Sequence, residues 1–288
     1  MMLENKEKLK IVEKAYKNRL TLLNIIKRCG TVHIGGCLSA MDILTVLYNK
    51  VLKHDPRNPK WKERDIFFLS AGHKAVSLYI VLQSQGYFER NLLWTFNKLH
   101  SKLPMHPDEK LLPGIEFPTG SLGHGLSVGC GVATAFKKDK LNRRVFVLMG
   151  DGESEEGSVW EAALIANKYK LDNLIVIIDA NGLQSEACVE EILPIAPIDE
   201  KFKAFGWSIR NINGHDINQI YKALIEAPYE INKPTCIVAH TIKAKGVDFA
   251  ENKVEFHHWS LSDEASVNDA IKCLKTCYER ELKGKKIG

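Results

Sequence analysis

The sequence lacks the features of membrane-spanning, secreted and disulfide-stabilised proteins. None of its apolar runs reaches eighteen residues, so no transmembrane helix and no membrane association are expected. The opening segment, MMLENKEKLKIVEK, has no apolar core and no small-residue cleavage site, unlike a secretory signal. The seven cysteines are odd in number and contain no C-x-x-C pair, which favours reduced thiols over a disulfide framework. We therefore expect a cytoplasmic protein.

Several common binding and catalytic motifs are also missing. The 40 basic and 35 acidic residues give a net charge of +5 with no basic stripe interleaved with aromatic residues, so nucleic acid is not an expected partner. Gly152 to Gly157 has the spacing of a phosphate-binding P-loop but not its lysine. H-E-x-x-H does not occur, which excludes a zinc-protease helix. The dinucleotide-like GHGLSVG follows an irregular loop instead of a strand.

Short apolar segments alternate regularly with helical patterns along the chain. The segments predicted as buried strands are 66–70, 143–150, 173–181, 207–212 and 235–242. Continuous apolar strands separated by helices indicate a parallel sheet that is covered on both faces. We predict an α/β fold: a doubly wound, mainly parallel sheet with helices on both faces, in a single domain over residues 1–288.

Helical periodicity predicts the elements around this sheet. A long amphipathic helix is expected over residues 4–29, and Ser39 is expected to cap a second helix over residues 39–52. A terminal helix is expected over residues 264–280. Residues 97–124 have no periodicity, and a connection this long inside a compact domain usually has a function.

Polar side chains stand at the ends of two consecutive predicted strands. Asp151 follows one strand within Gly150-Asp151-Gly152, and Asn181 follows the next. In such sheets ligands bind beyond the carboxyl ends of the strands, where carboxylate and amide oxygens suit Mg²⁺ or Ca²⁺. Because Mg²⁺ shares its shell with phosphate oxygens, the pattern favours a metal-bridged diphosphate. The alternative is that the two motifs are only a tight turn and an Asx turn.

Histidines gather in the loops that converge on the same edge. His33 lies in a glycine-rich break, His73 follows the first strand, His106 lies in the long loop and His257 in the last loop. A lone histidine is more often structural, but several in converging loops indicate a polar pocket. Because zinc-binding spacing is absent, hydrogen bonding and proton transfer to a polyhydroxylated or phosphorylated ligand are the expected roles.

Segments along nearly the whole chain match one enzyme family in order. They are RLTLLNIIKRCGTVHIGGCLSAMDILTVLY, LSAGHKAVSLYIVL, MHPDEKLLPGIEFPTGSLGHGLSVGCGVA, MGDGESEEGSVWEAALIANKYKLDNLIVIIDANG, NGHD (213–216) and TIKAKGVDFAENKVEFHHW. The chain resembles the N-terminal, thiamine-diphosphate-binding half of transketolases. The fourth segment is similar to the family's GDG…N cofactor signature.

The resemblance implies a cofactor site in three parts. Asp151, Asn181 and the carbonyl of Leu183 would hold Mg²⁺, or Ca²⁺ or Mn²⁺ in its place. The residues implied at the diphosphate or its surroundings are Gly152, Asn181, His73 and His257. Those implied beside the cofactor's rings are Gly120, Ser121 and Leu122.

The resemblance also implies an activity and the residues nearest to it. A two-carbon ketol unit would pass from a ketose to an aldose, with carbanion stabilisation supplied by the cofactor. The histidines implied to line the substrate channel are His33, His106 and His257, and these three together with His73 are implied to serve catalysis. Ser121, His124 and Trp259 depart from the family's pattern, which predicts a specialised sugar or sugar-phosphate substrate.

Single-chain members of the family are about twice as long as this sequence, which predicts a split enzyme. A C-terminal transketolase subunit would supply the pyrimidine-binding domain and the glutamate that activates the cofactor. Two chains of each kind would form a heterotetramer. Two alternatives are a different thiamine-diphosphate component, either 1-deoxyxylulose-5-phosphate synthase-like or 2-oxoacid-decarboxylating, and a catalytically silent transketolase-like scaffold.

Overall fold

A computed structural model describes residues 2–29, 32–185, 187–257 and 264–284 of the chain. Its sheet has five strands in the order β1-β2-β3-β5-β4, and every neighbouring pair is parallel. The strands are β1 (Ile66–Leu69), β2 (Val145–Gly150), β3 (Leu174–Ala180), β4 (Ser208–Asn213) and β5 (Thr235–His240). All five were predicted. The residues of β1, β2, β3 and β5 are almost all buried, as a sheet covered on both faces requires, whereas β4 at the edge alternates apolar and polar residues.

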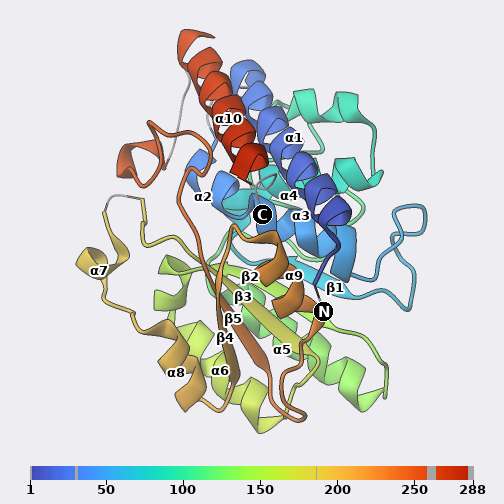
Figure 1. Cartoon of the computed structure of the whole chain (residues 1–288). Coiled ribbons are helices and arrows are strands. Elements are labelled where there is room, and N and C mark those ends of the chain that lie inside the picture. The colour runs from blue at the N-terminus through green and yellow to red at the C-terminus, as the bar shows by residue number, and fades with distance from the viewer. Residues whose placement is uncertain (1, 30–31, 186, 258–263, 285–288) are drawn as a thin grey trace.

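Helices cover both faces of the sheet (Figure 1). One layer contains α1 (Asn5–Cys29), α3 (Met41–Val46), α4 (Ala75–Gln85) and α9 (Ile217–Ile225). The opposite layer contains α5 (His124–Lys138), α6 (Gly157–Lys168) and α8 (Ile198–Ala204). Alternate residues of each strand enter the two cores: Phe67 and Leu69 face the first layer, and Ile66 and Phe68 face the second. The α/β prediction is confirmed.

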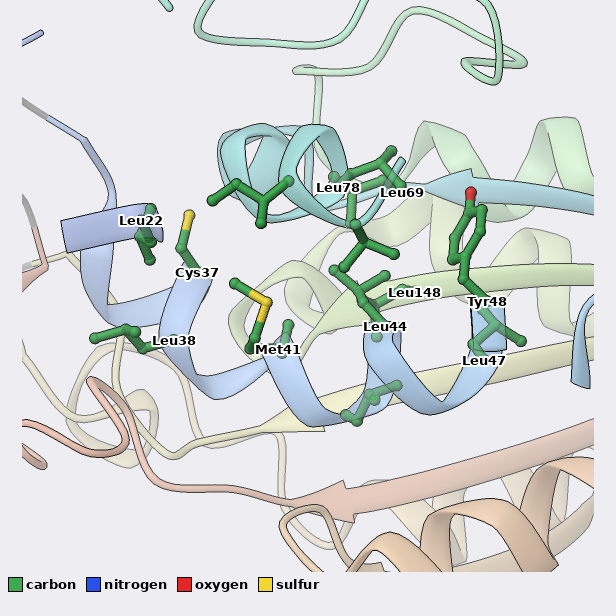
Figure 2. Close-up of a cluster of buried hydrophobic side chains, with 14 of the residues drawn as sticks. Leu22, Cys37, Leu38, Met41, Leu44, Leu47, Tyr48, Leu69, Leu78 and Leu148 are labelled. Carbon is green, nitrogen blue, oxygen red and sulfur yellow. The ribbon is translucent and has the colours of Figure 1, made fainter. Parts of the chain in front are cut away.

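The core under the first layer is built mainly from leucine and isoleucine side chains. Figure 2 shows Leu22, Leu38 and Leu44 on helices, together with Leu148 on strand β2. Each of these side chains is fully buried. Burial of one such side chain stabilises the fold by about 1.5–3 kcal/mol, so this layer holds the amino-terminal helices firmly against the sheet.

The segment after α1 differs from the predicted helix over residues 39–52. It forms α2 (Ile34–Ser39), then α3, then a π-helical turn at Leu47–Val51. Ser39 ends α2 instead of capping a helix, so that part of the prediction was wrong. Its hydroxyl bonds to Asp179 Oδ2 at 2.6 Å, a long-range contact that local capping rules cannot anticipate.

The remaining elements are short, apart from the last helix. Helix α7 spans Val189–Ile192, and single 3-10 turns occupy Gly72–Lys74, Arg90–Thr95, Gly152–Glu155 and Val254–Phe256. Helix α10 spans Glu264–Gly284 and packs on α1, where Tyr16 and Tyr278 stack with ring centroids 4.1 Å apart. Over the described ranges, no helix is both long and apolar enough to cross a membrane.

Strand register brings the predicted polar strand ends together. Gly150 pairs with Asp179, and Ala180 pairs with His240, so β2, β3 and β5 end at one level. Asp151 and Asn181 directly follow two of these ends. The prediction that these two residues share one edge of the sheet is confirmed.

Candidate active site

A cavity of about 250 Å³ opens at the carboxyl edge of the sheet. Of the eleven predicted site residues, ten line it: His33, His73, His106, Gly120, Leu122, Asp151, Gly152, Asn181, Leu183 and His257. They come from loops after β1, β2, β3 and β5, from the break before α2 and from the long loop over residues 97–123. The fold therefore gathers into one cavity residues that are up to 224 positions apart, from His33 to His257.

The four predicted histidines form a cluster in this cavity. The His33 ring lies 5.4 Å from the ring of His73, 6.1 Å from that of His106 and 5.7 Å from that of His257, measured between centroids. Burial, followed by the charge of Lys74 and by the other histidines, holds the pKa of His73 well below its usual range. Burial also lowers the pKa of His106. Neutral imidazoles result, which can both donate and accept hydrogen bonds.

Oxygen atoms from two strand ends face the cavity. The Asp151 carboxylate accepts hydrogen bonds from the backbone N–H groups of Gly152 at 3.0 Å and Gly182 at 2.5 Å. The Asn181 side-chain oxygen accepts from Leu183 N at 3.2 Å. Burial raises the pKa of Asp151 above its usual value, although these hydrogen bonds oppose the shift. A buried carboxylate of this kind gains by binding a cation.

A buried ion pair, which was not predicted from the sequence, lies beneath the cavity. Lys74 Nζ lies 2.6 Å from Asp179 Oδ2, and the two side chains are 1% and 0% exposed. Ser39 and Thr241 also donate hydrogen bonds to this carboxylate. The available signal was a charged residue inside an apolar segment, in LIVIIDA for Asp179 and in HKAVSLYIV for Lys74.

A second lysine, Lys243, was also missed. Its ammonium donates to the carbonyls of Leu183 at 2.9 Å and Gln184 at 2.7 Å, and lies 2.8 Å from Nδ1 of His257. Burial, followed by the charge of Lys74, lowers the pKa of Lys243 to about 8. The chain has 40 basic residues, so its sequence offers no signal that distinguishes this lysine from the exposed ones.

The adjacent glycines 35 and 36 leave space for the two buried lysines. A β-carbon on Gly35 would lie 2.8 Å from Cγ of Lys243, and one on Gly36 would lie 3.0 Å from Cε of Lys74. Only hydrogen fits without displacing a lysine stem. The two glycines, which the sequence suggested were a break between helices, are thus needed so that both lysine side chains can pack beside the cavity.

Glu153 joins three segments around the cavity. Its buried carboxylate accepts hydrogen bonds from Gly123 N at 2.9 Å, from Gly150 N at 3.2 Å and from the Ser70 hydroxyl. Burial raises its pKa, although these bonds oppose the shift. Glu153 thereby fixes the loop that carries Gly120 and Leu122 relative to β1 and β2.

The structure does not bring every predicted residue into the cavity. Ser121 lies between two lining residues, but its own side chain is exposed and does not line the cavity. His124, the first residue of α5, is also exposed and outside the lining. Trp259 lies outside the described residues. Over the described ranges, no three His, Cys, Asp or Glu side chains converge as a metal site, so a metal here would depend on amide and carbonyl oxygens.

Comparison with known proteins identifies a thiamine-diphosphate-binding domain. The profile of the family described as "Transketolase, thiamine diphosphate binding domain" matches residues 12–278. The chain belongs to this transketolase family.

Two similar relatives are single subunits. The chain is 41% identical over 246 residues to the 6-deoxy-6-sulfo-D-fructose transketolase subunit SqwG of a Clostridium species, covering 85% of this chain and 90% of that one. It is 42% identical over 242 residues to an apulose-4-phosphate transketolase subunit of Phocaeicola vulgatus, covering 84% and 86%.

Solved transketolases share the fold. The enzyme from Campylobacter jejuni has a TM-score of 0.83 and 32% identity, covering 96% of this chain and 48% of that one. A transketolase mutant from Pichia stipitis has a TM-score of 0.85 and 30% identity, covering 93% and 40%. The chain thus spans about half the length or less of these solved transketolases, but most of the length of the two subunits.

Removing the carboxylate beneath the cavity should destabilise the fold strongly. Asp179→Asn leaves Lys74 as a buried charge without its counter-ion, which typically costs about 3–5 kcal/mol. Urea unfolding of the full chain measures this loss. Glu200→Gln, which breaks an exposed pair with Lys203, is the control and should leave the free energy of unfolding nearly unchanged. Equal stability of Asp179→Asn and wild type would contradict the prediction.

His73 should remain neutral throughout the physiological pH range. An NMR titration of the full chain, with the signal assigned by His73→Asn, should give a midpoint well below the ordinary value of about 6.5. Because burial and the charge of Lys74 disfavour the imidazolium, Lys74→Met should raise this midpoint. A wild-type midpoint at or above the ordinary value would show that the cavity does not desolvate His73.

Proposed function

We propose that this chain is the catalytic, thiamine-diphosphate-binding subunit of a two-chain transketolase. The supporting observation is the content of one cavity: three oxygen ligands at the ends of β2 and β3, two buried lysines and four clustered histidines. Oxygen ligands suit Mg²⁺, lysines suit a diphosphate, and histidines suit proton transfer to a sugar. Family membership and the subunit names of similar proteins favour the same function.

The cavity residues fit a metal-bound diphosphate. The Asp151 carboxylate, the Asn181 amide oxygen and the Leu183 carbonyl would hold Mg²⁺, or Ca²⁺ or Mn²⁺ in its place. Gly152 approaches the same point without a β-carbon, which would lie 2.9 Å from the Gln184 side chain. The Leu183 carbonyl already accepts a hydrogen bond from Lys243, so a metal ion would share this oxygen or displace the ammonium.

The remaining proposed site residues divide between cofactor and sugar. When bound, the cofactor supplies carbanion stabilisation for breaking and forming the carbon–carbon bond. His73 and His257 would contact the cofactor, with Gly120 and Leu122 beside its rings. The histidine cluster would orient the sugar hydroxyls and move their protons, since imidazoles held neutral can accept them. His33 and His106 would do so from the substrate side.

The substrate class is a ketose donor and an aldose acceptor, either free or phosphorylated. Two similar subunits are named for 6-deoxy-6-sulfo-D-fructose and for apulose 4-phosphate, which favours a modified sugar as the substrate of this chain. We propose that residues 1–288 form one domain. Ser121 and His124, which depart from the family's sequence pattern, do not line the cavity. Their effect on sugar specificity would therefore be exerted from outside the cavity. Free thiols at all seven cysteines fit a cytoplasmic location.

A C-terminal transketolase subunit carrying a pyrimidine-binding domain is the proposed partner. Exposed apolar side chains occur on α6 and α7 and at the residue just after each helix: Leu164, Ile165, Tyr169, Ile192 and Leu193. Helix α7 and the start of α6 follow strand ends at the cavity, so a partner that covered the whole length of α6 would reach the site. Closed symmetry favours two chains of each kind in a heterotetramer.

Metal and cofactor binding should depend on each other through Asp151. In the co-purified complex, Asp151→Ala should abolish thiamine diphosphate binding measured by calorimetry in the presence of Mg²⁺, with the fold retained by circular dichroism. Removal of Mg²⁺ from wild type with a chelator should weaken binding in the same way. Wild-type affinity in the variant would exclude Asp151 from the site. Asp139→Ala, at the exposed end of α5, is the matched control and should bind normally.

Catalysis should require the partner. The full chain mixed with Mg²⁺, thiamine diphosphate, a ketose and an aldose should show no two-carbon transfer, because activation of the cofactor is assigned to a glutamate of the partner. Addition of the partner subunit should restore transfer. Replacing Leu164 and Ile165 by aspartate should prevent co-purification of the two chains. Transfer by the isolated chain at the rate of the complex would refute the two-chain proposal.

A further inference from the structure

The NGHD segment over residues 213–216 lies outside the cavity. It forms the turn between β4 and α9 (Ile217–Ile225). Asp216 caps α9 by accepting hydrogen bonds from Asn218 N and Gln219 N. Gly214 packs so tightly that a β-carbon would lie 2.4 Å from Cγ2 of Thr241. The turn therefore packs against the loop that follows β5. The third residue of the segment, His215, has a separate set of contacts.

His215 joins a buried carboxylate to that loop. Its Nδ1 lies 2.8 Å from Asp42 Oδ2, and its Nε2 accepts a hydrogen bond from the backbone N–H of Ile242 at 2.8 Å. An Nε2 that accepts from a backbone donor has no proton, so the proton must be on Nδ1, where it is donated to Asp42. Both ring nitrogens are thus used, and the tautomer is fixed.

Asp42 is itself held in place. Arg19 donates to both of its oxygens at 2.7 Å and also to the Leu38 carbonyl at 3.1 Å. The Arg19 and Asp42 side chains are 8% and 9% exposed, and His215 is 12% exposed. A chain of hydrogen bonds, largely shielded from solvent, therefore connects α1 to the loop after β5. It runs from Arg19 through Asp42 on α3 and His215 to the backbone of Ile242.

Ile242 is flanked by two residues of the active-site region. Thr241 donates its hydroxyl to Asp179, and Lys243 reaches the carbonyl of Leu183 and the ring of His257. The backbone of Ala244 is held separately by the Gly35 carbonyl at 3.0 Å. Backbone hydrogen bonds also hold Thr241 N to the Ala180 carbonyl and the Lys243 carbonyl to Asn252 N, each at 3.1 Å. Between Thr241 and Lys243, the Ile242 N–H is held by a side chain, that of His215.

We propose that His215 is a positioning residue for Lys243, acting through the backbone of Ile242. The Asp42–His215 pair sets the course of residues 241–243 and thereby the location of the lysine ammonium in the cavity. His215 itself lines a separate cavity beneath α10 and does not touch the proposed cofactor site. This inference rests on the proposed function, because Lys243 gains its role only if the cavity binds a diphosphate.

Two substitutions separate the two hydrogen bonds of His215. Asparagine places a donor where Nδ1 lies, and so keeps the bond to Asp42 but loses the acceptor for Ile242. Glutamine places an acceptor where Nε2 lies, and so keeps the bond to Ile242. In the co-purified complex with Mg²⁺, His215→Asn should raise the Kd of thiamine diphosphate about 10- to 100-fold, as loss of an outer-shell partner typically does. His215→Gln should bind close to wild type, and kcat at saturating cofactor should change less than Kd in either variant.

A double-mutant cycle with Lys243→Met tests whether the effect passes through the lysine. If it does, His215→Asn should change Kd little once Lys243 is already replaced. An undiminished effect in that background would overturn the proposal, and so would wild-type Kd in His215→Asn. Asp65→Asn is the matched control: Asp65 is a buried acid that accepts from Arg144 and from the backbone of Lys53, and it precedes β1 at the opposite edge of the sheet. It should lower stability without changing Kd.

The tautomer provides a measurement that does not depend on the variants folding. Nitrogen-15 NMR of the wild-type chain should show His215 protonated at Nδ1 and unprotonated at Nε2. A proton on Nε2 would mean that the bond to Ile242 does not exist, and the proposal would fail. A wild-type complex that binds no thiamine diphosphate would instead overturn the proposed function, and the inference with it.

Discussion

The carboxylate of Asp179 ties together four segments of the chain at the carboxyl edge of the sheet. Asp179 lies one residue before the end of β3, and its carboxylate binds Lys74 from the turn before α4, Ser39 from α2 and Thr241 from the loop after β5. A carboxylate with no exposed surface costs several kcal/mol unless it is paired and fully hydrogen-bonded. Each of the three donors is thus required by the burial of this one acid, and the loops that carry them are fixed as a consequence.

The cavity is arranged around this fixed point. Lys74 brings the first turn after β1, with His73, toward the strand ends, and Thr241 brings Lys243 from the other side. The two lysine stems then pass over Gly35 and Gly36, where any larger residue would collide with them. The histidine at position 33, two residues before this pair, is thereby placed within 5.4 Å of the His73 ring. Packing and electrostatics together determine the positions of the groups that the proposed chemistry uses.

The sequence predicts the sheet, the shared edge of β2 and β3 and the meeting of the histidines, because each has a local or topological signal. Apolar runs mark the strands, and parallel strands that follow in sequence often lie side by side, which places Asp151 beside Asn181. The histidines stand out because they are few and lie in loops. Ser39 and Lys243 carry no such signal, and the charge of Lys74 beside an apolar segment does not identify its partner. Asp179 lies 140 positions from Ser39 and 105 from Lys74. A capping rule applied to Ser39 therefore gave a wrong result where a long-range hydrogen bond prevails.

The charges around the cavity explain why a metal ion and a diphosphate would bind together. Asp151, Glu153 and Asp179 are three buried acids, and Lys74 and Lys243 are two cations, so the ionised set has one excess negative charge. A diphosphate alone would add further negative charge to a poorly solvated site, while a divalent cation alone would leave its remaining coordination positions to water. Bound together, the two nearly neutralise each other, so the site gains little net charge. The raised pKa of Asp151 has the same origin, because burial disfavours its negative charge. Without a cation, the site favours a proton on this carboxylate, and a bound metal ion would take the place of that proton.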